Sequence, residues 1–331
     1  MKNCTASYVN LLKTAIGSGI ISYPFLFKTY GYALAITIIF ISGLFAFLGL
    51  VLYAQCNYHY LLKHRQVTLS ALACETFPRI KVLVDVAVCF KCAGVAISYL
   101  IIIRTLLPNI IHNIFGNGYL LNNKILLFLY MLLLSPLSFF EKIGKLKYTS
   151  FFGLSCIFIV ICLSFYNAHS MPEFKTEDLV PMTIPSIIWL SGVGKVVFSF
   201  TCHQNIFTVQ SESTERAPEI YPVIRLCFVV VLTAFVTYIT FGFVNFLVFG
   251  KSVTEDVLSS FPNTTLTFFI QGLYVIVLGM SYPLQIHPTR LYFIDFLGLN
   301  QIQEDTMIAQ TNDIQVTVQN VNHPIPNKKN R

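Results

Sequence analysis

The chain has 331 residues, of which 55% are hydrophobic and only 11% charged, with a mean hydropathy of +0.68. A soluble domain carries about 25% charged residues, so this composition excludes an ordinary soluble protein and predicts a protein of the lipid bilayer. The net charge of +7 does not indicate a nucleic-acid partner, because the basic residues fall in short loops between apolar segments.

The first apolar segment, residues 8–27, contains residues that interrupt a helix. It carries Lys13, the sequence Gly17-Ser18-Gly19, and Pro24. In lipid the backbone must be satisfied within a helix, and a broken helix is tolerated only where it lines a protein cavity. Secondary transporters build their substrate sites from such discontinuous helices. The segment therefore predicts a carrier.

Apolar runs long enough to cross a bilayer recur along the chain, so we expect an all-α polytopic membrane protein with about eight transmembrane helices. These helices are expected to form one domain over residues 1–290. Residues 291–331 are rich in Asn and Gln and are expected to form a polar, disordered cytosolic tail. The predicted spans are residues 8–27, 31–56, 82–107, 124–140, 148–167, 187–209, 222–249 and 264–287.

The charges of the loops predict the orientation of the chain. With the N-terminus in the cytosol, most Lys and Arg residues fall in cytosolic loops, as the positive-inside rule requires. The C-terminus is then cytosolic as well. These charges do not distinguish a vacuolar or lysosomal membrane from a plasma membrane. The predicted outer loops contain few basic residues, namely Lys124, Lys175 and Lys251.

The span at residues 187–209 holds a dense polar cluster that includes Thr201, His203 and Asn205. Such a cluster is too costly to face lipid. Interhelical hydrogen bonds or a second broken helix beside the first both explain it. His203 either relays a proton or is a neutral ring bonded to a backbone carbonyl. Lys195, near the outer end of the same span, is expected to reach the interface, and Lys91, in the span at residues 82–107, to pair across helices.

Several stretches resemble, in order, the eukaryotic amino acid/auxin permease family. That family includes the vacuolar, the proton-coupled and the sodium-coupled neutral amino acid transporters. The resemblance covers roughly residues 5–290. The stretches are Asn10-Leu-Leu-Lys-Thr-Ala-Ile-Gly-Ser-Gly-Ile-Ile-Ser-Tyr-Pro24, Gly94 to Ile103, Leu146 to Ser150, Phe198 to Asn205, Tyr238 to Gly250 and Tyr282 to Pro288.

The resemblance implies a leucine-transporter-like fold of two inverted repeats, with an amino acid substrate at the midplane between two unwound helices. A half-helix N-terminus with free N–H groups suits the carboxylate of an amino acid. By this analogy the carboxylate is bound by the backbone N–H groups of Gly17, Ser18 and Gly19. The ammonium is bound by carbonyls near Thr14 and Phe198. The side-chain pocket is bordered by Phe200 and Thr201.

The resemblance also bears on the coupling ion. In sodium-coupled members an asparagine that helps to ligate sodium stands four residues before the first glycine of the break, and here that position is Lys13. An ammonium there would repel sodium, and proton-coupled and vacuolar members resemble this chain at that position. We therefore expect no sodium dependence. Lys13, His203 and Ser281 are the candidate ion-coupling residues, and the alternative for Lys13 is snorkelling toward the cytosolic face.

Together these features predict a secondary active transporter of small or neutral amino acids that works by alternating access, either proton-coupled or facilitative. We expect no enzyme activity, cofactor or metal site, because the spans hold no nucleophile elbow, paired carboxylates or metal-ligand cluster. The resemblance implies about eleven spans, whereas about eight are predicted here. A non-transporting amino acid sensor or a remnant of the same fold is therefore the alternative, and oligomerisation is a further expectation. A seven-helix receptor is disfavoured by the span count.

Overall fold

The computed structural model describes residues 4–61, 69–115, 122–138, 147–169, 176–203, 205–207, 210 and 220–297. Within these ranges the chain is helical and contains no strand, which confirms the all-α membrane class. The α-helices are α1 (Cys4–Ala15), α2 (Tyr23–Tyr30), α3 (Tyr32–Leu61), α4 (Leu69–Thr76), α5 (Lys81–Phe115), α6 (Asn123–Ser138), α7 (Lys147–His169), α8 (Ile188–Ser199), α10 (Ile220–Phe249) and α11 (Thr265–Phe296). Short turns of 3₁₀ helix join them at η1 (Ser18–Ser22), η2 (Pro78–Ile80), η4 (Thr176–Asp178), η5 (Gly250–Ser252) and η6 (Val257–Ser259).

In the described part of the chain, four helical stretches are long and apolar enough to cross a membrane: Tyr32–Tyr58, Pro78–Ile114, Ile220–Ser252 and Thr265–Ile294. Three shorter apolar helices, Asn123–Pro136, Phe151–Tyr166 and Ile188–Ser199, lie at further predicted spans. The first predicted span is divided among α1, η1 and α2. The total of eight spans therefore stays a prediction.

Some helices run past the predicted ends of their spans. α5 continues to Phe115 although it contains Pro108. α11 continues to Phe296 although it contains Pro283 and Pro288. A helix in lipid has no other partner for its backbone groups, which favours its continuation through proline. The first residues of the predicted polar tail are thus helical, and residues 298–331 lie outside the described residues.

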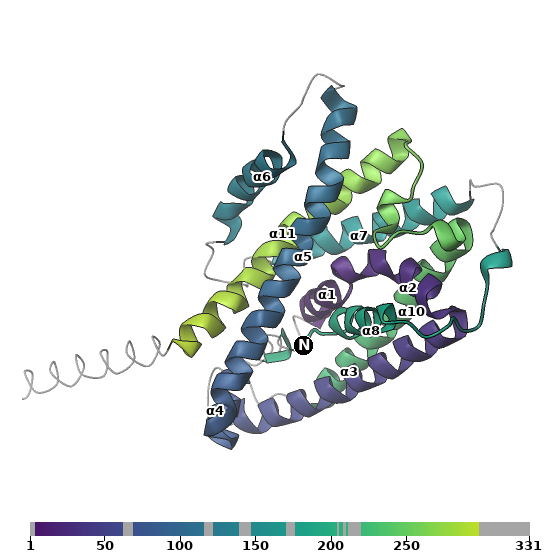
Figure 1. The fold of residues 1–331 in the computed structure, drawn as a ribbon. Helices are drawn as coiled ribbons and strands as arrows, with labels where there is room; N and C mark the ends of the chain where they lie inside the picture. Colours follow the sequence, from purple (N-terminus) through teal and green to yellow (C-terminus); the bar gives the residue numbers. More distant parts are fainter. Residues whose placement is uncertain are drawn as a thin grey trace, which may run out of the picture.

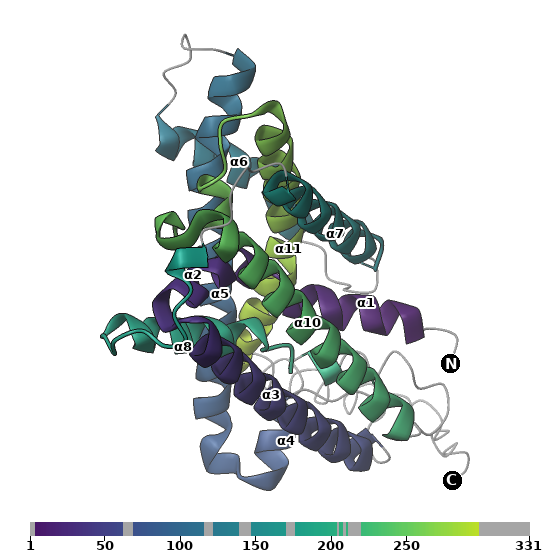
Figure 2. The same ribbon diagram turned by 90° about the vertical axis from the view of Figure 1, so that its right-hand side faces the viewer.

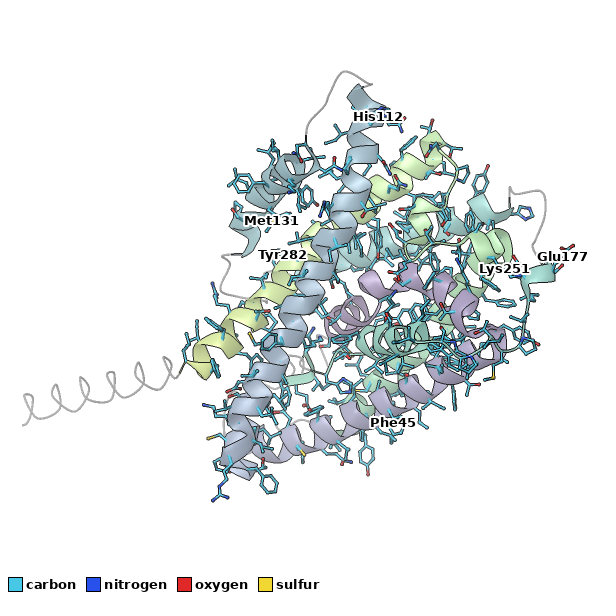
Figure 3. The ribbon with its side chains drawn as sticks, viewed as in Figure 1. Phe45, His112, Met131, Glu177, Lys251 and Tyr282 are labelled. Carbon is cyan, nitrogen blue, oxygen red and sulfur yellow. The ribbon has the colours of Figure 1, made fainter. Side chains whose placement is uncertain are left out.

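Two short helices, α1 and α8, occupy the middle of the bundle. Figure 1 shows α1 and α8 nearly end-on between α5 and α3, and α3 and α10 run side by side in Figure 2. α5 packs along α11, and α6 lies outside both of them. The outer faces are apolar: Phe45 of α3, labelled in Figure 3, is 68% exposed. An apolar exterior of this kind suits lipid contact.

A tight turn fixes the entry to α8. Gly31 ends α2 with a φ of 83°, a left-handed conformation that favours glycine. The N–H of Tyr32 then donates to the carbonyl of Val180 at 3.0 Å, and the N–H of Thr183 donates to the carbonyl of Tyr30 at 3.0 Å. The segment that leads into α8 is thereby held against the α2–α3 turn, which places α8 beside η1.

Candidate substrate cavity

The first apolar segment is interrupted at the glycines. α1 ends at Ala15, and the chain resumes as η1 at Ser18 before α2 begins at Tyr23. A β-carbon at Gly17 would lie 3.2 Å from the hydroxyl oxygen of Tyr99 on α5. The backbone of the break therefore approaches α5 more closely than a larger residue would comfortably allow.

A second break follows α8, which is one of the two explanations offered for the polar cluster of this span. α8 ends at Ser199, and the chain is non-helical at Thr201 and Cys202 before helical residues return at 205–207. The N–H of Thr201 donates to the carbonyl of Phe198 at 3.1 Å, a turn tighter than an α-helix. The predicted span at residues 187–209 is thus divided into two helical pieces within its described residues.

Hydrogen bonds join the two breaks. The side-chain amide of Asn205 donates to Oγ1 of Thr14 at 2.6 Å, and that hydroxyl donates in turn to the carbonyl of Asn10 at 2.8 Å. The hydroxyl of Tyr238 on α10 lies against the carbonyls of both Ala15 and Ser199. The ends of α1 and α8 therefore form one connected polar unit in the middle of the bundle.

A cavity of about 540 Å³ lies beside this unit, between the two breaks and α5. Ligand cavities for small molecules typically measure about 300–1,000 Å³, so an amino acid fits. The breaks contribute Thr14, Gly17, Gly19, Phe198, Ser199 and Thr201 to its wall. α5 contributes polar and apolar groups, among them Lys91, Val95, Ser98, Tyr99, Ile101 and Ile102, and α11 contributes Gln285.

Charged side chains lie at the cavity wall. Lys91 donates from Nζ to the carbonyl of Thr201 at 3.3 Å, which supplies the cross-helix partner that the sequence left unnamed. Lys195 of α8 forms an ion pair with Glu255 at 3.1 Å. Its Nζ also lies 5.3 Å from the ring centroid of Phe25. The Lys195–Glu255 pair connects α8 to the loop between α10 and α11 across one end of the cavity.

The structure brings most of the predicted substrate-binding residues to this cavity. Thr14, Gly17, Gly19, Phe198 and Thr201 all line it. Ser18 begins η1, and its side chain lies outside the described part of the structure.

Phe200, which was predicted to border the side-chain pocket, does not line this cavity. Its side chain is 2% exposed, and its ring packs edge-on against the Tyr238 ring at a centroid distance of 5.1 Å. The chain turns after Ser199, so Phe198, Ser199 and Thr201 face the cavity while Phe200 points to α3 and α10. Phe200 supports the break from behind.

The candidate ion-coupling residues lie around the cavity rather than in its described wall. Lys13 is 2% exposed, so the snorkelling alternative is wrong. A β-carbon at Gly153 of α7 would stand 2.9 Å from Cε and 3.0 Å from Nζ of Lys13, so the ammonium lies in a notch left by that glycine. Ser281 is buried, and its hydroxyl donates to the carbonyl of Val277 at 2.7 Å within α11.

His203 lies behind the second break, against α3. Its Nε2 is 3.1 Å from the carbonyl oxygen of Ala46, and its ring packs edge-on to Tyr53 at a centroid distance of 5.7 Å. A β-carbon at Gly49 would stand 2.6 Å from that Nε2. Of the two alternatives for His203, the hydrogen bond to a backbone carbonyl is the one that the geometry contains.

Sequence reasoning missed several residues of this site. Tyr99, Gln285 and Tyr238 lie in stretches that carried the family resemblance, but no role was given to them. A polar Ser98-Tyr99 pair inside an apolar span was the available signal for α5. Glu255 carried no signal, because an acidic residue in a polar loop is ordinary.

Two interrupted helices around a polar cavity, inside a bundle of apolar helices, define the class of polytopic membrane carriers. A family model described as transmembrane amino acid transporter protein matches residues 2–320, and the chain belongs to this family. This confirms the family resemblance that the sequence motifs indicated.

Relatives of the chain carry transporter names. It is similar to vacuolar amino acid transporter 6 of Saccharomyces cerevisiae, with 27% identity over 324 residues, 96% of this chain and 71% of the relative. Vacuolar amino acid transporter 5 of Schizosaccharomyces pombe is 30% identical over 287 residues, 86% of this chain and 67% of the relative. Amino acid transporter AVT6A of Arabidopsis thaliana is 26% identical over 313 residues, 85% of this chain and 65% of the relative.

Proposed function

We propose that this chain moves amino acids across a membrane by alternating access and that the cavity between the two breaks and α5 holds the substrate. One observation carries the proposal: a cavity of about 540 Å³ stands where two interrupted helices meet, in a member of an amino acid transporter family. The freed backbone groups of interrupted helices are what such carriers use to bind charged substrate groups.

The substrate's backbone groups are the proposed anchor. The N–H groups of the Gly17-Ser18-Gly19 break face its carboxylate, which the positive ends of N–H dipoles favour. Carbonyls near Thr14 and Phe198 face its ammonium. The Phe198 carbonyl already accepts from the N–H groups of Thr201 and Phe200, so the substrate's ammonium would replace one of these donors. Thr201 borders the side-chain pocket.

The substrate's side chain meets a wall with mixed character. Val95, Ile101 and Ile102 of α5 are apolar, while Ser98 and Tyr99 offer hydroxyl groups. This lining supports small or neutral amino acids as the substrate class. A long substrate side chain would reach the Lys195–Glu255 ion pair at the cavity end.

Transport is proposed to be proton-coupled or facilitative and independent of sodium. Lys13 supports this, because its ammonium is buried against α7 at the position where the resemblance implies an asparagine ligand in sodium-coupled members. His203 and Ser281 are the other proposed coupling residues. Of the three proposed coupling residues, His203 has the ordinary pKa that is closest to physiological pH.

The proposed setting is an internal membrane of the vacuolar kind, with both termini in the cytosol and eight spans within residues 1–290. Three of the similar proteins have vacuolar amino acid transporter names. The orientation depends on the loop charges alone.

The experiment is uptake of a labelled amino acid mixture into proteoliposomes of the purified chain, with and without an inward proton gradient and with sodium absent. Gradient-stimulated uptake supports proton coupling, and uptake that only equilibrates supports a facilitative carrier. Saturable binding without flux in a folded, inserted protein would instead support the amino acid sensor. Absence of both binding and flux would overturn the proposal.

A further inference from the structure

Tyr238 stands at the junction of the two breaks. It lies in the middle of α10, and its side chain is fully buried. Its hydroxyl donates to the carbonyl of Ala15 and, at 3.0 Å, to the carbonyl of Ser199, so its one proton is shared between the two oxygens. Ala15 is the last residue of α1 and Ser199 the last residue of α8. One side chain thus reaches the C-terminal ends of both interrupted helices.

Two such helix ends cannot face each other without partners for their last carbonyls. The last carbonyls of a helix have no partner within it, and the helix dipole makes this end equivalent to about −0.5 charge. An unsatisfied carbonyl in an apolar medium is costly. In carriers with broken helices these carbonyl ends are typical cation ligands. The junction therefore needs a cation or a hydrogen-bond donor.

The ring of Tyr238 is held so that its hydroxyl stays at the junction. It stacks on Tyr23 of α2 with centroids 4.1 Å apart and planes 10° apart. The ring of Phe200 packs against it at 88°. A phenylalanine would keep both ring contacts and lose only the hydroxyl.

A second resident donor serves the same break. Lys91 of α5 donates from Nζ to the carbonyl of Thr201 at 3.3 Å. Thr201 lies two residues beyond the end of α8. The carbonyls around this break are thus satisfied by protein groups from α10 and α5.

We propose that Tyr238 is a positioning residue whose hydroxyl, supported by the Lys91 ammonium at the neighbouring carbonyl, takes the place of a bound metal cation at the junction of α1 and α8. It holds the two breaks together without an ion. Removal of the hydroxyl leaves a vacant site between two carbonyl ends that accepts a small monovalent cation such as sodium. This inference goes beyond the proposed transport activity and does not depend on it.

The test measures thermal unfolding of the purified full chain in lipid nanodiscs, in sodium chloride and in N-methylglucamine chloride of equal ionic strength. The wild-type chain should melt at the same temperature in both salts. Tyr238→Phe should melt lower than wild type in N-methylglucamine and recover by about 2 °C or more in sodium. The melting temperature of Tyr238→Phe in lithium chloride and in potassium chloride then shows which ion size fits the vacant site.

Tyr130→Phe is the matched control. The Tyr130 hydroxyl also donates to a backbone carbonyl, that of Val275, at 2.9 Å, but at the α6–α11 contact. This variant should lose stability without gaining a response to sodium. Equal melting of Tyr238→Phe in both salts, or an equal sodium response of Tyr130→Phe, would overturn the proposal.

Replacement of Tyr238 by 4-aminophenylalanine separates the donor from the ring. The amino group keeps an N–H donor at the same place, so this variant should show wild-type stability and no sodium response. If Tyr238→Phe does not fold, recovery of the fold by 4-aminophenylalanine supports the donor role, and failure of both variants overturns it.

Discussion

Gly19 of η1 and Ser199 of α8 are in direct contact at the point where the two interrupted helices meet. A β-carbon at Gly19 would overlap the Ser199 hydroxyl and lie 3.1 Å from the Ser199 β-carbon. The two breaks can therefore approach this closely only because position 19 has no side chain. The cavity wall includes both residues, so its shape depends on this contact.

Gly19→Ala should push η1 away from α8. Overpacking of this kind costs about 1–3 kcal/mol, and we expect amino acid uptake to fall at least about tenfold, equivalent to about 1.4 kcal/mol of activation free energy. Uptake and thermal unfolding measure the two effects. Ser199→Gly in the same chain should recover part of the uptake, since it removes the colliding atoms. Gly272→Ala on α11, where a β-carbon meets nothing within 4 Å, is the control, and an equal loss there would contradict the contact argument.

Lys13→Asn should abolish uptake or make it sensitive to sodium, because it replaces the buried ammonium with a neutral oxygen ligand. Uptake with and without sodium measures this. Gly153→Ala tests the same place from α7, since its β-carbon would stand 2.9 Å from Cε of Lys13 and displace the ammonium. Unchanged rate and ion dependence in Lys13→Asn would show that the ion-site assignment is wrong.

His203→Ala should change the pH profile of uptake if the imidazole relays a proton. The hydrogen bond to the Ala46 carbonyl, 3.1 Å long, gives a second expectation. Its loss should cost about 0.5–1.5 kcal/mol of stability, the net contribution of a typical hydrogen bond, because the Ala46 carbonyl keeps its donor within α3. Uptake from pH 5 to pH 8, roughly the range over which histidine titrates, together with thermal unfolding, separates the effects. A lower melting temperature with an unmoved pH profile identifies His203 as a packing residue.

The ion pair between Lys195 and Glu255 should matter for uptake more than for stability. Both side chains are partly exposed, at 28% and 68%, and exposed pairs contribute at most about 1 kcal/mol. Lys195→Glu or Glu255→Lys alone should lower uptake, since each places like charges at the cavity end, and the charge-swapped double variant should recover it. Lys251→Ala is the control. Lys251, labelled in Figure 3, pairs with Asp178 at 3.2 Å away from the described cavity wall, and a comparable loss there would contradict the assignment.

Asp256, in the loop between α10 and α11, should make stability depend on pH. Burial raises the pKa of its carboxyl above 3.8, against hydrogen bonds from Ser259 and from the N–H of Leu258 that favour the charged form. The folded protein then binds a proton more tightly than the unfolded chain, so the stabilising contribution is largest at acid pH. It is lost as the pH rises through the raised pKa. Asp256→Asn should flatten the dependence of the melting temperature on pH in this range. An unchanged dependence would contradict the raised pKa.

The membrane class and the positions of the helices could be predicted from the sequence. A bilayer allows only a helix or a closed barrel to span it, so an apolar run of sufficient length reports a helix without knowledge of its neighbours. The break at Gly17-Ser18-Gly19 was equally local, because glycine and a following proline weaken a helix wherever it packs. The polar run around Thr201 and His203 was too costly to face lipid, but this left a second break and interhelical hydrogen bonds as the two explanations, and only the folded chain decided for a break.

The directions of the side chains at the breaks were decided by the tertiary structure. A regular helix repeats its faces, but an unwound segment has no such period, so the sequence did not show that Ser199 faces the cavity and Phe200 faces away. The partners of Lys91 and Tyr238 lie at positions 201, 15 and 199, far along the chain. Which carbonyl meets which donor depends on how α5 and α10 pack against the broken helices, and only the folded bundle contains that information.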